Sequence, residues 1–521
     1  MLASSSLVER SPIESPYFGI TVSISAVLLW WMISTLTSPL RRYPGPFLAK
    51  WTNLWRLYHV WTQRYQWTIH ELHQKYGPIV RIGPNLLDLD YPELIKTIYG
   101  TDTKWRKTEF YDNNAIIVDG KIMHNLFSQT SPTEHARMKK PIAKYYSSSS
   151  VLTLETKMNR VIEEFFAQLE ERYMQNTKAV DLATWFGLYT WDMISTLTFS
   201  QPFGYMQQGN DFDGNINSSA LAVQYFARVG QIPIMDKFLG KNPIMRIGFP
   251  DLSHITRFAY QQLQDRLNQR RVDKLDKTDF LEYFLDGMEN NPDQNDANLV
   301  LNFVLANILA GADTTAITLR AVFGFLLDTP HAMDKLQNEI LAEGFDHSQA
   351  ISYSSARSLQ YLDAVVRESL RMHPSVAMPL ERYVPSHGLT LPDGSFLPRG
   401  TGVGMNPYII GRNQEVWGKD ANEFRPERWL KGDDEDEELY QQRLRKMKAA
   451  DLTFGGGSRI CLGRHIALVQ IYKAVATLVS RYEIRLADPK VKMKIISGWF
   501  PRQTHLIVKM CKRPEMKKGR V

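Results

Sequence analysis

One of the chain's two cysteines lies in a setting that suits an iron-binding thiolate. Cys461 follows three glycines and Arg459 in the stretch FGGGSRICLG, and a periodic apolar segment begins directly after it. At a helix N-terminus, free backbone N–H groups and the helix dipole lower the pKa of a thiol. The glycines allow a tight turn and a close approach to a flat group. A buried structural cysteine is the simpler alternative, and a phosphate loop is disfavoured because the GxxxxGK[ST] spacing is absent.

A second group of polar residues interrupts a long apolar segment. Residues 298–327 have helical periodicity, and Gly311, Asp313 and Thr314 stand near their middle. Such residues oppose helix propensity, and the Thr314 hydroxyl could bond back to the backbone and bend the helix. A carboxylate beside a hydroxyl can also deliver protons. The segment is therefore either a polar kink or a proton-handling site.

A third group consists of charged residues. Glu368 and Arg371 are three residues apart on a predicted helix over 355–372, so they share a face, although most such pairs are solvated and contribute little. The later stretch FRPERW supplies Arg428 as a further cation.

The three groups, in this order, resemble the cytochrome P450 family. The pattern Phe454-x-x-Gly457-x-Arg459-x-Cys461-x-Gly463 resembles its heme-binding loop, and it is most similar to fungal microsomal members of the pisatin demethylase and benzoate para-hydroxylase type. The resemblance covers the chain from Pro44 to the C-terminus. It implies the cytochrome P450 fold, which is mainly α with small β-sheets (α+β), preceded by one N-terminal transmembrane helix.

The resemblance also implies roles for individual residues. Cys461 would be the axial iron ligand of heme b (iron protoporphyrin IX), and Thr314 and Asp313 would be catalytic residues that manage protons, with Gly311 opening room beside the iron. Glu368, Arg371 and Arg428 would form a structural network. The remaining heme contacts would be Phe454, Gly463, Arg459, Arg382, His135 and Lys139. Lys139 stands where the family usually has arginine, so Arg137 is an alternative propionate partner.

Residues that would contact the substrate follow from the same resemblance. They are Asn302, Asn307, Ala306, Ala310, Val376, Met378, Trp499 and Phe500, with the loop over 110–126. They predict an apolar, aromatic pocket with Asn307 as a polar group for orienting a bulky ligand. Ordinary core packing is the alternative for all of them.

The implied function is a heme-thiolate monooxygenase that inserts one oxygen atom from O2 into a small apolar molecule in fungal secondary metabolism. Electrons would come from NADPH through NADPH–cytochrome P450 reductase, with cytochrome b5 as a further candidate donor, because the chain lacks a flavin or dinucleotide fingerprint. Alternatives are a heme-thiolate isomerase, dehydratase or peroxygenase, and a catalytically silent membrane-tethered scaffold.

Composition restricts the other classes of function. The net charge of +7 is modest for 521 residues and no nucleic-acid-binding motif is present, so we expect no nucleic-acid partner. Two cysteines cannot build a disulfide framework, which favours a reducing compartment.

The N-terminal region predicts a membrane anchor. Residues 17–38 contain no charged residue and are long enough to cross a bilayer, while Arg41 and Arg42 follow at once. A cleaved signal peptide is the alternative. We therefore expect a lumenal N-terminus (1–16), an anchor (17–38), a proline-rich hinge (39–50) and a cytosolic heme-thiolate domain (51–521), in a single-pass protein of the endoplasmic reticulum.

These groups must be positioned by a mainly helical body. Periodicity predicts helices over 61–75, 132–146, 151–173, 182–197, 256–274, 298–327, 331–340, 355–372 and 465–481. It predicts strands at 79–82, 86–90, 383–384, 389–391 and 402–405, and a late pair formed by 492–496 and 505–508. The acidic run over 433–438 is expected to be a solvated insert.

Overall fold

The computed structural model describes residues 16–102, 104–118, 120–175, 178–270, 278–291 and 296–514. The expected lumenal segment lies almost wholly outside these residues, as do positions 271–274 of one predicted helix. The helices of the first half are α1 (Pro16–Leu36), α2 (Phe47–Trp51), α3 (Leu54–Trp61), α4 (Tyr65–Tyr76), α5 (Ile95–Tyr99), α6 (Pro132–Lys139), α7 (Ser148–Leu152), α8 (Glu155–Leu169), α9 (Leu182–Phe199), α10 (Tyr205–Gln208), α11 (Asn215–Val229), α12 (Met235–Phe238) and α13 (Ser253–Arg270). Those of the second half are α14 (Phe280–Glu289), α15 (Ala297–Asp328), α16 (Pro330–Ala342), α17 (Tyr353–Ser358), α18 (Gln360–Met372), α19 (Pro407–Ile410), α20 (Gln414–Trp417), α21 (Glu437–Ala449) and α22 (Arg464–Arg481).

The strands form several small sheets. The strands are β1 (Ile79–Gly83), β2 (Leu86–Leu89), β3 (Ile116–Val118), β4 (Lys121–Met123), β5 (Val180–Asp181), β6 (Arg382–Tyr383), β7 (Leu389–Thr390), β8 (Phe396–Leu397), β9 (Gly402–Gly404), β10 (Tyr482–Leu486), β11 (Lys494–Ile496), β12 (Arg502–Thr504) and β13 (Ile507–Lys512). The largest sheet has the order β1–β2–β9–β6, with β2 and β9 parallel and the other neighbours antiparallel. The others are β10–β13–β5 and the pairs β11–β12, β3–β4 and β7–β8.

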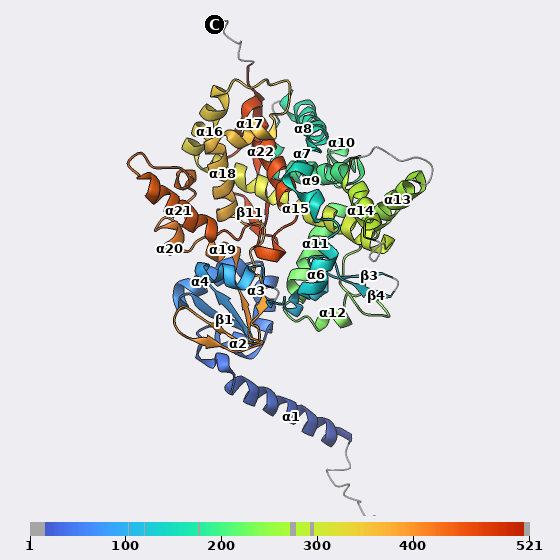
Figure 1. Ribbon diagram of the computed structural model, residues 1–521, viewed down its shortest axis with the longest axis vertical. Coiled ribbons are helices and arrows are strands. Elements are labelled where there is room, and N and C mark those ends of the chain that lie inside the picture. The colour runs from blue at the N-terminus through green and yellow to red at the C-terminus, as the bar shows by residue number, and fades with distance from the viewer. Residues whose placement is uncertain are drawn as a thin grey trace, which may run out of the picture.

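The helix α15 runs through the middle of the body, and α9, α18 and α22 pack around it (Figure 1). It is apolar nearly all round, as is expected of a helix that is covered on every side. Its apolar residues belong to the largest hydrophobic cluster, together with those of α8, α9 and α22. Asp296 begins the helix, because its side chain accepts a hydrogen bond from the Asn298 N–H.

The sheet that contains β1 lies at one end of the body, and α1 leaves the body from that end (Figure 1). The segment after α1 is packed rather than loose, since the Arg81 N–H donates to the Pro44 carbonyl at 2.7 Å. A Cβ on Gly45 would lie 2.2 Å from the Arg81 carbonyl oxygen, so the backbone approach requires glycine there.

Several predicted helix bounds and one predicted strand pair are wrong; for example, the helix expected over 132–146 ends at Lys139, and the one expected over 151–173 is interrupted between α7 and α8. The helix predicted over 355–372 is broken at Leu359, whose extended backbone separates α17 from α18. The strand at 494–496 pairs with 502–504 instead of 505–508, and residues from Ile507 onward pair with β10 and β5. The acidic run lies at the surface, as predicted, and part of it begins α21, because the Asp436 side chain accepts a hydrogen bond from the Glu438 N–H. Acidic side chains stabilise a helix N-terminus, so this run stabilises the start of α21.

Candidate functional site

Cys461 lies between the short 3-10 helix η9 (Gly457–Arg459) and α22. Its N–H donates to the Phe454 carbonyl at 2.8 Å, which closes the loop. Backbone N–H groups of Gly463 and Arg464 interact with its sulfur, but burial outweighs them and raises the pKa of the Cys461 thiol. The expected lowering of this pKa is therefore wrong for the protein by itself, because desolvation exceeds the effect of the helix N-terminus. A metal cation at the sulfur would supply the missing positive charge and deprotonate the thiol.

Two of the glycines before Cys461 pack closely against a neighbouring segment of the protein. Gly457 has φ +53, and a Cβ there would lie 2.0 Å from the Tyr99 carbonyl oxygen at the end of α5. A Cβ on Gly456 would lie 3.0 Å from the Tyr99 Cβ. A Cβ on Gly463, in contrast, would meet no protein atom within 4 Å. The loop is therefore held against α5 on one side, and Gly463 faces open space.

Solvent can reach Cys461 and Ala310, although protein surrounds the Cys461 thiol closely enough for desolvation to raise its pKa. Ala306, Ala310 and Thr314 are four residues apart on α15 and form one stripe, which is less buried than the rest of the helix. Tyr146 lies near both elements: its hydroxyl donates to Asn307 Oδ1 at 2.9 Å, and burial together with the charge of Cys461 raises its pKa. The stripe and the thiol thus border an internal opening.

Thr314 makes the backbone bond that the sequence suggested. Its hydroxyl donates to the Ala310 carbonyl at 2.8 Å, and Ser375 Oγ donates to the Thr314 carbonyl at 3.0 Å. Gly311 has a packing role, because a Cβ there would lie 2.8 Å from Ile194 Cδ1 on α9. Room for α9 is thus a sufficient reason for this glycine, and its expected role beside an iron remains a prediction.

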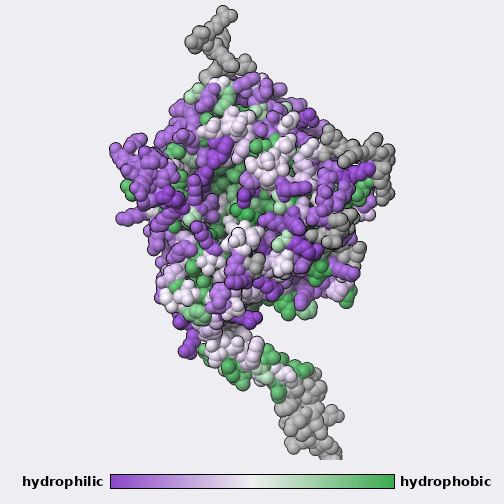
Figure 2. All heavy atoms as spheres, in the orientation of Figure 1, coloured by the Kyte–Doolittle hydropathy of each residue, from purple (hydrophilic) through white to green (hydrophobic). Residues whose placement is uncertain are grey.

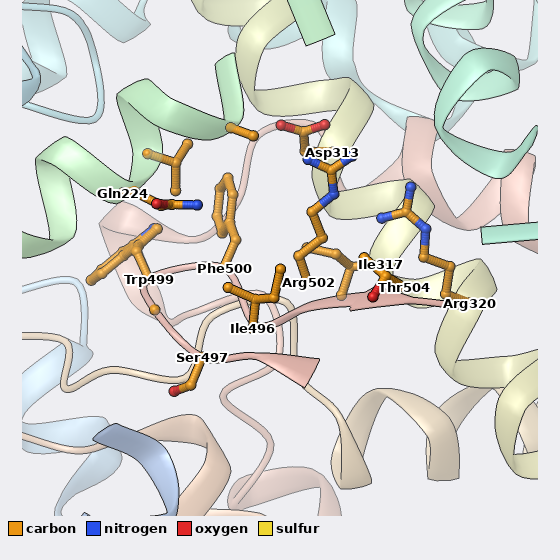
Figure 3. A pocket seen from close by; sticks show the side chains of 13 residues that line it. Gln224, Asp313, Ile317, Arg320, Ile496, Ser497, Trp499, Phe500, Arg502 and Thr504 are labelled. Atoms are coloured by element: carbon orange, nitrogen blue, oxygen red, sulfur yellow. The ribbon is translucent and has the colours of Figure 1, made fainter. Parts of the chain in front are cut away.

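Asp313 points away from the stripe toward a cavity of about 280 Å³. Its two carboxylate oxygens accept hydrogen bonds from Trp191 Nε1 at 3.2 Å and Ser219 Oγ at 3.3 Å. The cavity lies between α11, α15 and the β11–β12 hairpin, and its wall includes the predicted substrate residues Trp499 and Phe500 (Figure 3).

Glu368, Arg371 and Arg428 are brought together as the sequence predicted. Arg371 donates to Glu368 from Nε at 2.9 Å and from Nη2 at 2.7 Å, and Arg428 Nε donates to Glu368 Oε1 at 2.7 Å. The Trp429 Nε1 and the Arg425 N–H also donate to this carboxylate. Burial would raise the pKa of Glu368, but the Arg371 hydrogen bonds and the charges of both arginines hold it below its usual value. The network joins α18 to the segment that precedes the cysteine loop.

The four predicted propionate contacts lie near one another. Arg459 donates to the Gln129 carbonyl at 2.6 Å, and Lys139 donates to the Ser458 carbonyl in the cysteine loop at 3.3 Å. The charges of Arg459 and Lys139 act on His135, whose pKa is lowered to about 3 by burial and by these and other cations. Arg382 is a further neighbour, because its charge helps burial to lower the pKa of Arg459 to about 10.

Arg137, the alternative to Lys139, is on the solvent side of α6. Its Nε donates to Glu134 Oε2 at 2.9 Å, and both side chains are about half exposed. Lys139 is therefore the member of this pair that reaches the cysteine loop.

Lys107 belongs to the same cluster, and sequence reasoning missed it. Its side chain is buried, its Nζ donates to the Phe127 carbonyl at 2.6 Å, and it lies 4.2 Å from the centre of the Tyr111 ring. Burial and the charges of Arg382 and Arg459 lower its pKa well below the usual value. Lys107 belongs to no motif, so the sequence alone does not mark it as a heme contact. Its segment reaches the cation cluster through the isolated β-bridge between Lys107 and Arg382.

The charges of this cluster fit a ligand with carboxylates. Within the described part of the chain, no acidic side chain forms an ion pair with Lys107, Lys139, Arg382 or Arg459. Buried cations without partners are costly, so the cluster is built for anionic groups. Among the described residues, no group of three or more His, Cys, Asp or Glu could hold an ion. An iron at Cys461 would need its other ligands from a cofactor, and heme supplies both those ligands and two propionates.

Several of the predicted substrate residues belong to one apolar cluster. Trp499 is buried in an aromatic cluster with Phe110, Phe127 and Phe226, at centroid distances of 5.2 to 5.6 Å. Met378 and Val376 pack against the same hydrophobic cluster. These apolar side chains come from five separate segments, so the aromatic lining was only partly predictable from the sequence.

The expected role of Asn307 as a polar group that orients a ligand is corrected by its hydrogen bonds within the protein. Its Oδ1 accepts from Tyr146 and its Nδ2 donates to Thr198 Oγ1 at 2.9 Å, and the side chain is buried. Asn302 is buried too and donates to the His124 carbonyl. Asn307 is thus engaged with the protein on both of its polar atoms, and the polar groups available to a ligand lie elsewhere.

Comparisons with known proteins agree with this geometry. The sequence model of the family described as Cytochrome P450 matches residues 44–507. Cytochrome P450 monooxygenase cfoH of Aspergillus candidus is 43% identical over 495 residues, which are 94% of this chain and 92% of that protein. Cytochrome P450 monooxygenase cicH of Emericella nidulans is 36% identical over 476 residues, which are 90% of this chain and 93% of that protein.

Proposed function

The chain belongs to the cytochrome P450 family, and from that premise we propose that Cys461 binds the heme iron of a monooxygenase that oxidises a small apolar molecule. As a member of this family, the protein is a heme-thiolate oxidoreductase that uses heme, O2 and electrons from NADPH through a reductase. The observation that carries the residue assignments is an accessible thiol beside a cluster of buried and half-buried cations that have no acidic partner among the described residues. Similarity to the Aspergillus and Emericella relatives supports a role in fungal secondary metabolism.

The cysteine loop and the cations would hold the cofactor. The Gly463 and Arg464 N–H groups stabilise the thiolate of Cys461, and Arg382, Arg459, Lys107 and Lys139 bind the propionates. When bound, heme activates O2 and transfers one oxygen atom to the substrate. The hydrogen bonds of Glu368 fix α18 relative to the segment that precedes the cysteine loop, and Glu368 contacts no reacting atom.

Protons would be handled at two neighbouring side chains of α15. The Thr314 hydroxyl hydrogen is engaged with the Ala310 carbonyl, so its oxygen presents lone pairs that can accept a hydrogen bond from the opening. Asp313 faces the cavity on the other side and is oriented by Trp191 and Ser219. Because the two side chains face different sides of α15, proton delivery from Asp313 to Thr314 Oγ1 requires rotation of the Asp313 side chain or a chain of waters around the helix.

A pair of adjacent threonines tests this proposal. Thr315 Oγ1 makes the same kind of bond, to the Gly311 carbonyl at 2.9 Å, but is buried in the core. With NADPH, reductase and a turned-over substrate, Thr314→Ala should divert O2 consumption into released peroxide severalfold more than Thr315→Ala. Equal peroxide release by the two variants would contradict the role of Thr314.

We also propose that α1 anchors the protein in the membrane of the endoplasmic reticulum, with the catalytic body in the cytosol. At about 1.5 Å per residue, its 21 residues extend about 30 Å, the thickness of a bilayer core. The described side chains of α1 are almost all exposed (Figure 2), and Arg41 and Arg42 follow. Among the described residues, α15 is the helix that is long and apolar enough to cross a membrane, but 67% of its most apolar window is buried inside the body, and Ile20–Leu36 of α1 is a shorter apolar helix.

Exposed apolar side chains near α1 support the same orientation. Phe47 on α2 is 72% exposed, and Phe238 on α12 and Ile244 after it are 67% and 94% exposed. The helices α1, α2 and α12 lie at the same end of the molecule (Figure 1). Extraction of membranes with alkaline carbonate tests the anchor: the full chain should stay in the membrane, and a chain that begins at Ser38 should be released.

We propose NADPH–cytochrome P450 reductase as the electron donor, with cytochrome b5 as a second candidate. The support is the family membership together with the absence of a flavin or dinucleotide fingerprint in the sequence.

A further inference from the structure

The buried side chain of Tyr111 has no role in the proposed function. It lies on the short 3-10 helix η4 (Glu109–Asn114), and only 1% of it is exposed. Among the residues that the structure describes, no group forms a hydrogen bond of normal geometry with its hydroxyl. A buried tyrosine hydroxyl usually has a partner, because burying an unpaired polar group costs free energy. The missing partner of Tyr111 therefore has to come from a bound group.

The groups around this hydroxyl are donors and cations. Burial raises the pKa of Tyr111 to about 12, while the Arg382 side chain and the Glu381 backbone oppose the rise. Groups that stabilise the ionised oxygen in this way are donors, so they leave the hydroxyl hydrogen without an acceptor. Tyr111 also interacts electrostatically with Arg459, and Lys107 Nζ lies 4.2 Å from the centre of its ring. The hydroxyl thus lies within the cation cluster, and what it lacks there is an acceptor.

The carboxylate of Glu381 also acts on Tyr111, but its oxygens are already occupied. Its Oε1 accepts from Arg56 Nη2, and its Oε2 accepts from Thr108 Oγ1 at 2.7 Å. Both oxygens of this carboxylate therefore have donors of their own. The acceptor that fits beside Tyr111 is an oxygen of a further anionic group, which the surrounding cations would attract.

We propose that the Tyr111 hydroxyl donates a hydrogen bond to a propionate of the bound heme. This inference rests on the proposed function, which assigns Lys107, Arg382 and Arg459 to the same propionates. A carboxylate has about four lone-pair sites, so it can accept from a phenol as well as from cations. The loop over 110–126 was expected to contact substrate, and the inference assigns the hydroxyl of Tyr111 to the cofactor instead.

The protein fixes the ring of Tyr111. The ring makes edge contacts with Phe127 and Trp499, at centroid distances of 5.3 and 6.0 Å, and Lys107 Nζ lies over its face. A donor whose ring is already fixed loses little conformational entropy when it forms a hydrogen bond. Because Trp499 is also a predicted substrate residue, Tyr111 connects the aromatic cluster to the cofactor.

Heme retention and reduction potential test the proposal on the purified full chain with heme. Tyr111→Phe removes the donor and keeps the ring. Transfer of heme to apomyoglobin should become severalfold faster, because one hydrogen bond to the propionate is lost. The midpoint reduction potential should become more negative, because a less compensated propionate charge favours ferric over ferrous heme.

Tyr189→Phe is the matched control. Tyr189 on α9 is also fully buried, and its hydroxyl also has no hydrogen-bond partner among the described residues. Burial raises its pKa, and within the described structure no charged side chain contributes to that shift. Removal of its oxygen should therefore leave the heme-transfer rate and the potential as they are in the parent.

A second variant changes the same hydrogen bond in the opposite direction. The hydroxyl of 3-fluorotyrosine is more acidic and is a stronger donor, so Tyr111→3-fluorotyrosine should slow heme transfer and make the potential more positive. Altered packing alone does not give opposite shifts in the two variants. The fluorinated variant also keeps the ring and the hydroxyl, so it remains informative if Tyr111→Phe folds poorly.

Two results would overturn the inference. One is a transfer rate and a potential in Tyr111→Phe equal to those in Tyr189→Phe, because the hydroxyl would then bond to a buried water. The other is a shift in the same direction in both Tyr111 variants. The carbon-monoxide spectrum of the same samples separates the two proposals: a parent with the thiolate band and an unaffected Tyr111→Phe contradicts this inference alone, whereas a parent without the band contradicts the proposed function and the inference together.

Discussion

Replacing Glu368 by glutamine tests how strongly the buried network holds the body together. The carboxylate accepts five hydrogen bonds: two from Arg371, one from Arg428, one from the Arg425 N–H and one from Trp429. Glutamine keeps the shape, but it removes the negative charge and turns an NH2 group toward the arginines. Arg371 and Arg428 then remain buried without their counter-charge.

The cost follows from this geometry. Removing one partner of a buried ion pair destabilises a protein by about 3–5 kcal/mol, because the other charge stays in a poorly solvated place. Arg371 and Arg428 retain bonds to backbone carbonyls such as those of Gly411 and Trp417, so we expect a value within this range rather than above it. Glu437, which pairs with Lys431 at the surface, gives the matched control: Glu437→Gln should leave the free energy of unfolding nearly unchanged.

The pH dependence has a defined sign. Because the pKa of Glu368 in the folded protein is below the usual glutamate value of 4.5, the stabilisation is fully present above about pH 4.5 and is lost as the pH falls through the folded pKa. Urea unfolding of both proteins from pH 7 downward should therefore give a stability gap that narrows below about pH 4.5. A gap under 1 kcal/mol at pH 7, or one that widens in acid, would refute the reasoning.

Three further perturbations test other parts of the site. Gly457→Ala places a methyl group against the Tyr99 carbonyl oxygen and should lower heme incorporation severalfold, measured as heme per protein. Gly432→Ala should not, because a Cβ there would make only ordinary contact with Glu435; equal heme content in the two variants would contradict the steric account. Lys107→Met removes one buried cation and should speed transfer of heme to apomyoglobin severalfold, and an unchanged rate would remove Lys107 from the propionate cluster. Asn307→Leu leaves its two partners unsatisfied and should cost about 1–3 kcal/mol of stability without changing ligand affinity; the reverse pattern would restore Asn307 as a ligand contact.

The parts of the site that could be predicted are those built from spaced motifs. Glu368 and Arg371 are three residues apart on one helix, so they share a face whatever packs against it. Arg428 of FRPERW needs only to reach that face. The position of Cys461 before a helix follows from the apolar periodicity after it. Local spacing carries this information, and the tertiary structure adds the distances and two further donors to Glu368, the Arg425 N–H and Trp429 Nε1.

The remaining parts depend on contacts between distant segments. Lys107 reaches Arg459 only because β-bridge pairing at Arg382 brings its segment to the cysteine loop. Arg320 and Arg502 share a cavity because the β11–β12 hairpin packs on α15. The pKa of the Cys461 thiol was mispredicted for a related reason: the helix N-terminus is visible in the sequence, but the burial that outweighs it is not.

The most direct test of the account is the carbon-monoxide difference spectrum of the reduced protein, measured for the parent and for Cys461→Ser. Coordination by the Cys461 thiolate predicts the red-shifted Soret band of thiolate-bound heme in the parent and its loss in Cys461→Ser. Cys511, the other cysteine, lies on β13 at the surface, and Cys511→Ser should leave the band unchanged. Folded, heme-containing parent protein without this band, or a band that survives in Cys461→Ser, would contradict the account.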